Sequence, residues 1–205
     1  MPAPELILQG LTYAASRFEF LSIFWHIVFL LLLVMIAAGR RPNDRAIAMI
    51  LVLPLTTVAL VAFRTQNPFN GIVFSLASLL LYFLGWRITT AKCRITWDFL
   101  SIFGVLMILF GWIYPHFLPD PGWLRYLYAT PLGVVPCPTL SLVIGFTLLF
   151  HGFGSKAWML TLGIFGLFYA TVGIFRLGVI LDTGLLAGVM VLLVYGIRFK
   201  KITEA

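Results

Sequence analysis

Charged residues are scarce in this sequence, and their scarcity excludes an ordinary soluble domain. Only 10% of the 205 residues are Asp, Glu, Lys or Arg, whereas 61% are hydrophobic and the mean hydropathy is +1.05. A soluble domain of this length needs a far more polar surface. The apolar runs are continuous and lack the period-two alternation of barrel strands, so membrane-spanning helices are the expected elements.

Signatures of common enzyme classes are absent as well. There is no phosphate-cradling glycine loop, no GxSxG elbow, no HExxH spacing and no carboxylate pair with catalytic spacing. The two cysteines, Cys93 and Cys137, form no CxxC motif. The interiors of the apolar runs hold almost no ionisable residue, which disfavours a proton-pumping relay. No catalytic residue is assigned, the cofactor stays unknown, and a non-enzymatic role is favoured.

Seven apolar stretches account for most of the chain, and each crossing of a bilayer needs roughly 20 mainly apolar residues. We therefore predict an all-α integral membrane protein, a bundle of seven transmembrane helices. The spans are placed at 18–38, 46–63, 69–86, 97–114, 138–153, 156–175 and 183–198. The last two are divided only by Arg176 and Asp182. A re-entrant bend at 177–183 stays open there, whereas one fused helix would exceed a normal crossing.

The chain divides into three parts on this prediction. Residues 1–17 form an interfacial segment on the outer surface, with a frayed tail as the alternative. Residues 18–198 form the seven-helix transmembrane domain, which includes a proline-rich outer loop at 115–137. Residues 199–205 form a cytoplasmic tail.

Lysine and arginine fall unevenly into the gaps between the spans, which predicts the orientation. Ten lie on one side, at Arg40, Arg41, Arg45, Arg87, Lys92, Arg94, Lys156, Arg198, Lys200 and Lys201. Four lie on the other side, at Arg17, Arg64, Arg125 and Arg176. Because positive residues are retained in the cytoplasm, the N-terminus is expected outside and the C-terminus inside. The formal charge of +7 therefore indicates a lipid bilayer as partner, and no nucleic acid.

Small residues at helical spacing predict close helix packing. Gly184 and Gly188 form a GxxxG pair in the seventh span, and Gly166, Ala170 and Gly173 lie on one face of the sixth. Such faces let backbones approach and gain dispersion contacts. The pair serves either packing within the bundle or a homodimer seam.

The motif with the most chemical character is Gly133-Val134-Val135-Pro136-Cys137-Pro138-Thr139. Its prolines predict that Cys137 lies at a helix N-terminus, where unpaired N–H groups favour a thiolate. A thiolate binds soft metal ions or exchanges disulfides. The alternative is that the prolines shape the start of a helix and Cys137 packs as a small hydrophobe. Cys137 and Thr139 are the candidate binding residues of this motif, with Cys137 and His116 as a candidate metal pair on the outer side.

Four ionisable residues near the predicted outer ends of the spans complete the candidate binding residues. They are Glu19, Arg64, Arg176 and Asp182. Charges at this depth are unfavourable unless they are paired or hydrated, so Glu19 with Arg64, or Arg176 with Asp182, could line a polar vestibule. Snorkelling of the arginines to lipid headgroups is the alternative.

The chain resembles a bacterial family of small multi-pass membrane proteins that is known only as a domain of unknown function. The resemblance runs from about residue 15 to 195 and rests on Phe63, Asn67-Pro68, Phe74, Tyr114-Pro115, the motif from Gly133 to Thr139, and Gly145. It implies a multi-helix membrane fold and brings no activity. We predict that the bundle lies in a bacterial inner membrane. A shorter likeness links Val135-Pro136-Cys137-Pro138 to nickel and cobalt efflux permeases, but their histidine- and aspartate-rich helix motif is missing here.

Two functions follow as hypotheses. The first is a small permease or channel-like carrier of a small solute or soft metal ion, with its site where Pro136-Cys137-Pro138 starts a helix. The second is a non-catalytic membrane subunit or anchor that docks a protein partner through its apolar faces.

Overall fold

The computed structural model describes residues 3–93, 95–118 and 122–199, and every regular element in these ranges is helical. Among them the only β-type pairing is an isolated bridge between Asn43 and Lys92. The elements are α1 (Pro4–Arg17), α2 (Glu19–Ala37), α3 (Asp44–Arg64), α4 (Pro68–Trp86), α5 (Phe99–Ile113), η1 (Trp123–Arg125), α6 (Tyr126–Ala129), α7 (Pro136–Leu149), η2 (His151–Gly154), α8 (Lys156–Thr171), the π-helical η3 (Val172–Arg176) and α9 (Asp182–Arg198). The all-α prediction is confirmed. The predictions made for Arg94, Lys200, Lys201 and most of the tail fall outside the described residues.

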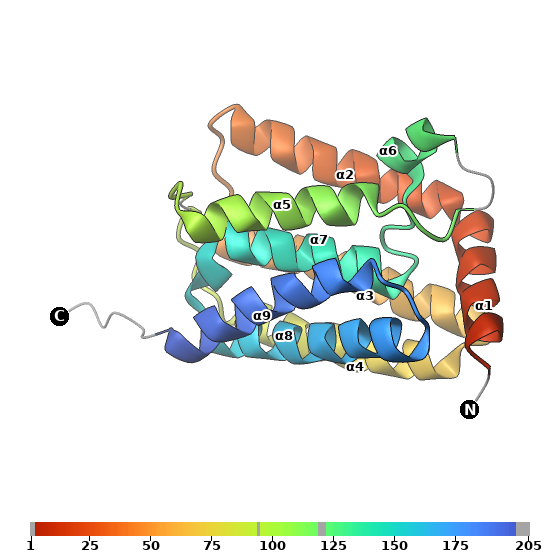
Figure 1. Cartoon of the computed structure of the whole chain (residues 1–205). Coiled ribbons are helices and arrows are strands. Elements are labelled where there is room, and N and C mark those ends of the chain that lie inside the picture. The colour runs from red at the N-terminus through yellow and green to blue at the C-terminus, as the bar shows by residue number, and fades with distance from the viewer. Residues whose placement is uncertain (1–2, 94, 119–121, 200–205) are drawn as a thin grey trace.

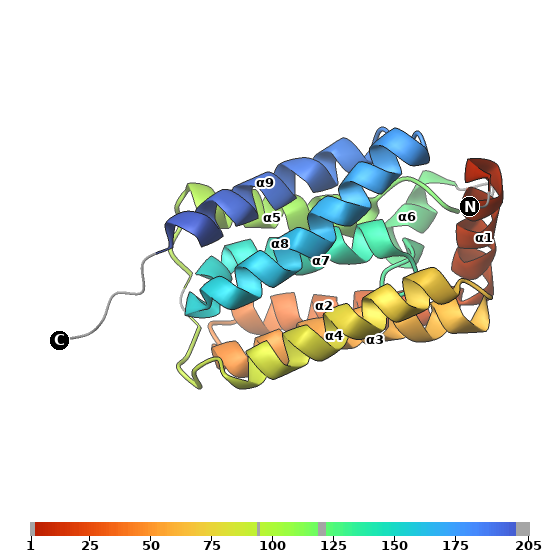
Figure 2. The same ribbon diagram turned by 90° about the horizontal axis from the view of Figure 1, so that it is seen from below.

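A helix occupies each of the seven predicted spans. Figures 1 and 2 show α2, α3, α4, α5, α7, α8 and α9 running roughly side by side, while α1 lies across one end of the bundle. We call this the α1 end, and the other the opposite end. Four helical stretches are long and apolar enough to cross a membrane, at Glu19–Ala37, Asp44–Arg64, Pro68–Trp86 and Lys156–Arg176. This is consistent with a membrane protein, while crossing by all seven helices stays a prediction.

Short polar side chains start several of these helices where the sequence is interrupted. The side chain of Asn43 accepts a hydrogen bond from the backbone N–H of Ala46 at 2.7 Å. Asp98 accepts one from Ser101 N–H at 2.9 Å in the same way. Each cap pairs one of the backbone N–H groups that a helix start leaves without a partner. Both capped helices therefore begin within two residues of the predicted span starts at 46 and 97.

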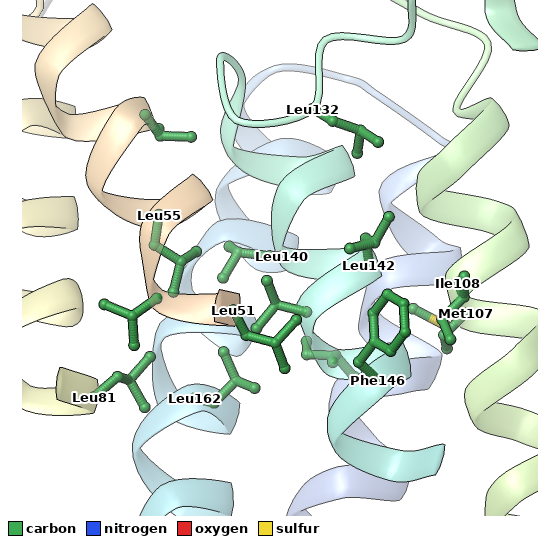
Figure 3. Close-up of a cluster of buried hydrophobic side chains, with 14 of the residues drawn as sticks. Leu51, Leu55, Leu81, Met107, Ile108, Leu132, Leu140, Leu142, Phe146 and Leu162 are labelled. Atoms are coloured by element: carbon green, nitrogen blue, oxygen red, sulfur yellow. The ribbon is translucent and has the colours of Figure 1, made fainter. Parts of the chain in front are cut away.

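Helix α7 is the centre of the bundle. All of its 14 residues are buried, and it contacts α3, α5, α8 and α9. Figure 3 shows Leu140, Leu142 and Phe146 from this helix among side chains of the neighbouring helices. A helix of this length spans only about 21 Å, less than a hydrocarbon core of about 30 Å. Because protein surrounds it, α7 need not reach either lipid surface.

The bounds of α7 correct the sequence-based placement of the fifth span at 138–153. The helix begins at Pro136 and ends at Leu149, and the short η2 follows it. Pro136 rather than Pro138 occupies the first helical position, which suits proline because that position needs no N–H partner.

Backbone contact between α5 and α7 depends on three glycines. A Cβ at Gly145 would lie 2.6 Å from the backbone nitrogen of Ile108 and 2.8 Å from the carbonyl oxygen of Gly104. A Cβ at Gly104 or at Gly111 of α5 would likewise lie 2.5–2.6 Å from a backbone nitrogen of α7. Small residues permit such an approach, which gains dispersion contacts along both helices. The sequence analysis missed Gly104 and Gly111 because no GxxxG pair marks them.

The predicted GxxxG pair packs within the chain. A Cβ at Gly184 would meet the ring of Phe110, and one at Gly188 would meet the side chain of Met107. Both partners belong to α5, so the pair serves intramolecular packing, which was one of the two alternatives. A homodimer seam at these glycines stays a prediction.

The last two spans are separate helices. Helices α8 and α9 pack against each other, and the π-helical η3 and a turn containing Gly178 (φ +67°) connect them. The turn lies in the segment where a bend was expected, so one fused helix is excluded. Glycine suits the positive φ because it carries no Cβ.

The helix ends divide the basic residues as predicted. Of the described lysines and arginines, Arg17, Arg64, Arg125 and Arg176 belong to helices that end or begin at the α1 end. The opposite end carries Arg40, Arg41, Arg45, Arg87, Lys92, Lys156 and Arg198. Between the two ends of the bundle, the outer faces of the helices expose large apolar side chains, such as Leu31, Leu60, Ile72 and Phe83. Such a surface suits contact with lipid.

Candidate functional site

A cavity of about 870 Å³ opens at the α1 end of the bundle. Its walls come from α1, α3, the start of α4, the start of α7, and the region from α8 to α9. Most of the wall is apolar, with contributions from Leu11, Val58 and Phe168. A cavity of this size and character fits a small, mainly apolar molecule. We call it the α1-end cavity.

A buried carboxyl group lies in the lining of this cavity. Asp182 is 1% exposed and accepts a hydrogen bond from the Tyr114 hydroxyl to Oδ1 at 2.6 Å. The Cys137 thiol donates to Oδ2 at 3.3 Å. We call these three residues the Asp182 cluster. Each carboxylate oxygen has two lone pairs, so both oxygens can accept a further hydrogen bond.

The π-helical segment makes room for this carboxyl group. Gly173 lies in η3, and a Cβ there would overlap Oδ2 of Asp182. The turn that follows brings the backbone N–H of Val179 to the Gly173 carbonyl at 2.9 Å, and α9 begins three residues later. Single π-helical turns interrupt α-helices at functional sites more often than elsewhere. The backbone irregularity and the buried acid therefore mark the same place.

Cys137 lies at a helix N-terminus, as predicted, but its surroundings do not favour the expected thiolate. Pro136 and Pro138 have no N–H, which leaves Cys137 and Thr139 as the only N–H donors of the first four helical residues. The nearest polar partner is the Asp182 carboxyl, which accepts the thiol hydrogen. A negative neighbour disfavours a second negative charge, so the neutral thiol is the form this geometry stabilises.

A second polar pair lines the α1-end cavity and was missed by the sequence analysis. The Tyr169 hydroxyl donates to Asn70 Oδ1 at 3.0 Å, and both side chains are buried. Tyr169 lies on the helix face that Gly166 and Gly173 share, and Asn70 follows the helix cap Asn67 by three residues. Those spacings could have identified both residues. Tyr114, the other missed residue, directly precedes Pro115.

Two of the candidate binding residues, Thr139 and His116, do not line the α1-end cavity. The Thr139 hydroxyl accepts from Gly133 N–H at 2.9 Å and donates to the Val135 carbonyl at 2.7 Å, so it fixes the loop before α7. His116 packs edge-on against Phe117, with ring centroids 4.3 Å apart, and burial lowers the pKa of His116. Within residues 3–93, 95–118 and 122–199, no group of three or more His, Cys, Asp or Glu side chains could hold a metal ion. A metal site at Cys137 and His116 stays a prediction.

The expected pairing of Glu19 with Arg64 is wrong. Glu19 accepts two hydrogen bonds from Arg125, at 3.0 Å from Nε and 2.6 Å from Nη2. This two-point geometry suits a guanidinium and a carboxylate better than a single contact does. Arg64 instead lines a separate hollow. Asp182 and Arg176 both line the α1-end cavity, with Asp182 buried and Arg176 exposed.

Comparisons with protein-family models, with curated proteins and with solved structures find no match to this chain. Function is therefore argued from the site itself.

Proposed function

We propose that this chain is a multi-pass membrane carrier or binding protein for a small, mainly apolar molecule that carries a hydrogen-bond-donating or cationic head. The observation that supports it is the α1-end cavity, whose apolar walls lead to the buried Asp182. Ionisable groups inside a membrane bundle are rare and mark ligand or ion pathways. A subunit or anchor, the second hypothesis, would not require a cavity of this size.

The position of the cavity supports binding rather than an open pore. The helices that line the cavity contribute residues from the part that lies near the α1 end. Examples are Val58, Val61 and Ala62 at the end of α3, and Pro136 and Cys137 at the start of α7. Towards the opposite end, α7 is buried on all sides by apolar neighbours. Transport would therefore need a conformational change that opens the opposite end.

The head group of the ligand follows from the polar atoms of the cavity. The Asp182 carboxyl offers acceptors, and the two prolines of α7 remove N–H donors that would otherwise favour an anion. Among the carboxyl groups of the described residues, Asp182 is the one that lines this cavity, and it is 1% exposed. A primary amine on an alkyl chain matches this arrangement.

The test is ligand binding to the protein in nanodiscs of zwitterionic lipid, measured by titration calorimetry with empty nanodiscs subtracted. Decylamine is expected to bind about tenfold more tightly than decanol, because only the amine gains a charge-assisted hydrogen bond to Asp182. Asp182→Asn should abolish that difference. Asp98→Asn, which removes an acid at the opposite end and keeps a good helix cap, should leave it unchanged. Absence of saturable binding by either probe would refute the proposal.

We further propose that all seven helices cross a bacterial inner membrane, with the α1 end outside and the C-terminus in the cytoplasm. The excess of basic residues at the opposite end supports this orientation. Both native cysteines are buried, so added cysteines can report it against a low background.

Ser16→Cys, at the α1 end, is expected to react with an impermeant maleimide on intact spheroplasts. Thr90→Cys, at the opposite end, should react only after the membrane is permeabilised. Both positions are exposed in the fold, so accessibility reports sidedness rather than burial. The reverse pattern would invert the orientation, and labelling of both on intact spheroplasts would mean that α2, α3 and α4 do not all cross the membrane.

A further inference from the structure

The four described arginines at the α1 end have three different surroundings. Arg125 is held by Glu19 through two hydrogen bonds, and Arg176 lines the α1-end cavity. Arg17 and Arg64 together line a separate hollow of about 530 Å³ between the start of α2 and the end of α3. We call it the two-arginine hollow.

The two-arginine hollow has apolar walls. Phe18, Phe20 and Leu21 line one side, and Leu60 and Val61 line the other. Phe20 and Leu60 are also exposed on the outer surface, so an apolar face continues from the hollow along α2 and α3. This combination offers a cationic site beside a surface suited to hydrocarbon.

The remaining polar side chain in this lining is already engaged. The Thr57 hydroxyl donates to the Gly133 carbonyl at 2.7 Å and accepts from Trp25 Nε1 at 3.0 Å. The side-chain groups left to recognise a ligand are therefore the guanidinium groups of Arg17 and Arg64.

No acidic side chain among the described residues forms an ion pair with Arg17 or Arg64. Glu19, only two residues after Arg17, is turned to Arg125 instead. Two like charges at the edge of a low-dielectric region repel each other, and an anion between them relieves that repulsion. Guanidinium groups match phosphate oxygens in geometry and donor number.

We propose that the two-arginine hollow binds the phosphate headgroup of an anionic phospholipid, whose acyl chains lie against the apolar face of α2 and α3. The position at the ends of the long apolar helices places Arg17 and Arg64 at headgroup level when these helices cross a bilayer. The apolar walls favour a lipid over free phosphate, which would gain nothing from them.

Native mass spectrometry of the full chain, released from mixed phosphatidylglycerol and phosphatidylcholine, tests this site. The wild type should retain phosphatidylglycerol in preference to phosphatidylcholine. Arg17→Gln combined with Arg64→Gln should weaken that preference about tenfold, since each basic group at a membrane surface contributes to anionic lipid binding. The control, Arg40→Gln with Arg41→Gln, makes the same charge change at exposed positions of the opposite end and should keep the preference.

Three outcomes would overturn the proposal. The first is undiminished phosphatidylglycerol retention by the Arg17 and Arg64 double variant. The second is displacement of the lipid by millimolar inorganic phosphate, which would assign the site to a soluble anion. The third is an equal loss in the control. Should the double variant fold poorly, Arg64→Lys keeps the charge but lacks the guanidinium fork, and it should retain less lipid than wild type.

Discussion

Gly145→Ala is expected to destabilise the protein by about 1–3 kcal/mol, even though alanine normally favours a helix interior. The added Cβ would lie 2.6 Å from the backbone nitrogen of Ile108, and backbone atoms cannot turn away as a side chain can. Helices α5 and α7 would have to separate, which loosens the contacts of the central helix. The measurement is thermal or denaturant unfolding of the purified protein in detergent.

Gly10→Ala is the matched control for this change. Gly10 lies inside α1, and a Cβ there would have no atom within 4 Å. The same substitution should stabilise at this position by about 0.5–1 kcal/mol. A Gly145→Ala variant as stable as the wild type would mean that α5 and α7 do not touch through their backbones.

Gly173→Ala should displace Asp182 and remove the preference for decylamine over decanol. A Cβ at this position would overlap the carboxyl oxygen that accepts from Cys137, so the carboxyl must leave its two donors. Buried donors left without partners are expected to lower stability by about 1–3 kcal/mol. Unfolding and probe binding on the same sample measure both effects.

A double-mutant cycle isolates this contact. In an Asp182→Ala background the overlapping carboxyl group is gone and the Cβ of residue 182 would lie 3.1 Å from the added Cβ. Gly173→Ala should then have a much smaller effect, and the coupling should exceed about 1 kcal/mol. Additive effects of the two substitutions would show that Gly173 does not make room for the carboxyl group. This result would also separate the site geometry from the identity of the ligand.

Individual residues of the candidate site could be predicted where their type stands out from the surrounding sequence. Cys137 between two prolines, and Asp182 at the boundary of an apolar run, were both selected as candidates, and both line the α1-end cavity. Their partnership was not predicted, because they are 45 residues apart in the sequence. The choice of partner depends on where α7 and α9 meet, which no local pattern encodes.

Pairings among the charged residues at the α1 end could not be predicted from local sequence patterns either. Glu19 and Arg64 were considered as a possible pair because both were placed near the outer boundary, yet Arg125 from the outer loop region reaches Glu19. Depth along the membrane can be read from hydropathy, but position around the bundle cannot. Tyr114 and Tyr169 were overlooked for a related reason, since a tyrosine in an apolar run reads as a membrane or core residue.

The sequence alone determined the helical class, the approximate positions of the seven apolar helices, and the division of basic residues between the two ends. These properties depend on continuous apolar length and on charge at the breaks, both of which are local. Tertiary structure decided that α7 is the buried centre, that Gly104, Gly111 and Gly145 bring α5 against it, and that Tyr114, Cys137 and Asp182 meet beside a cavity. Lipid and protein interior are equally apolar, so hydropathy cannot tell which helix face meets which, and packing shape makes that choice.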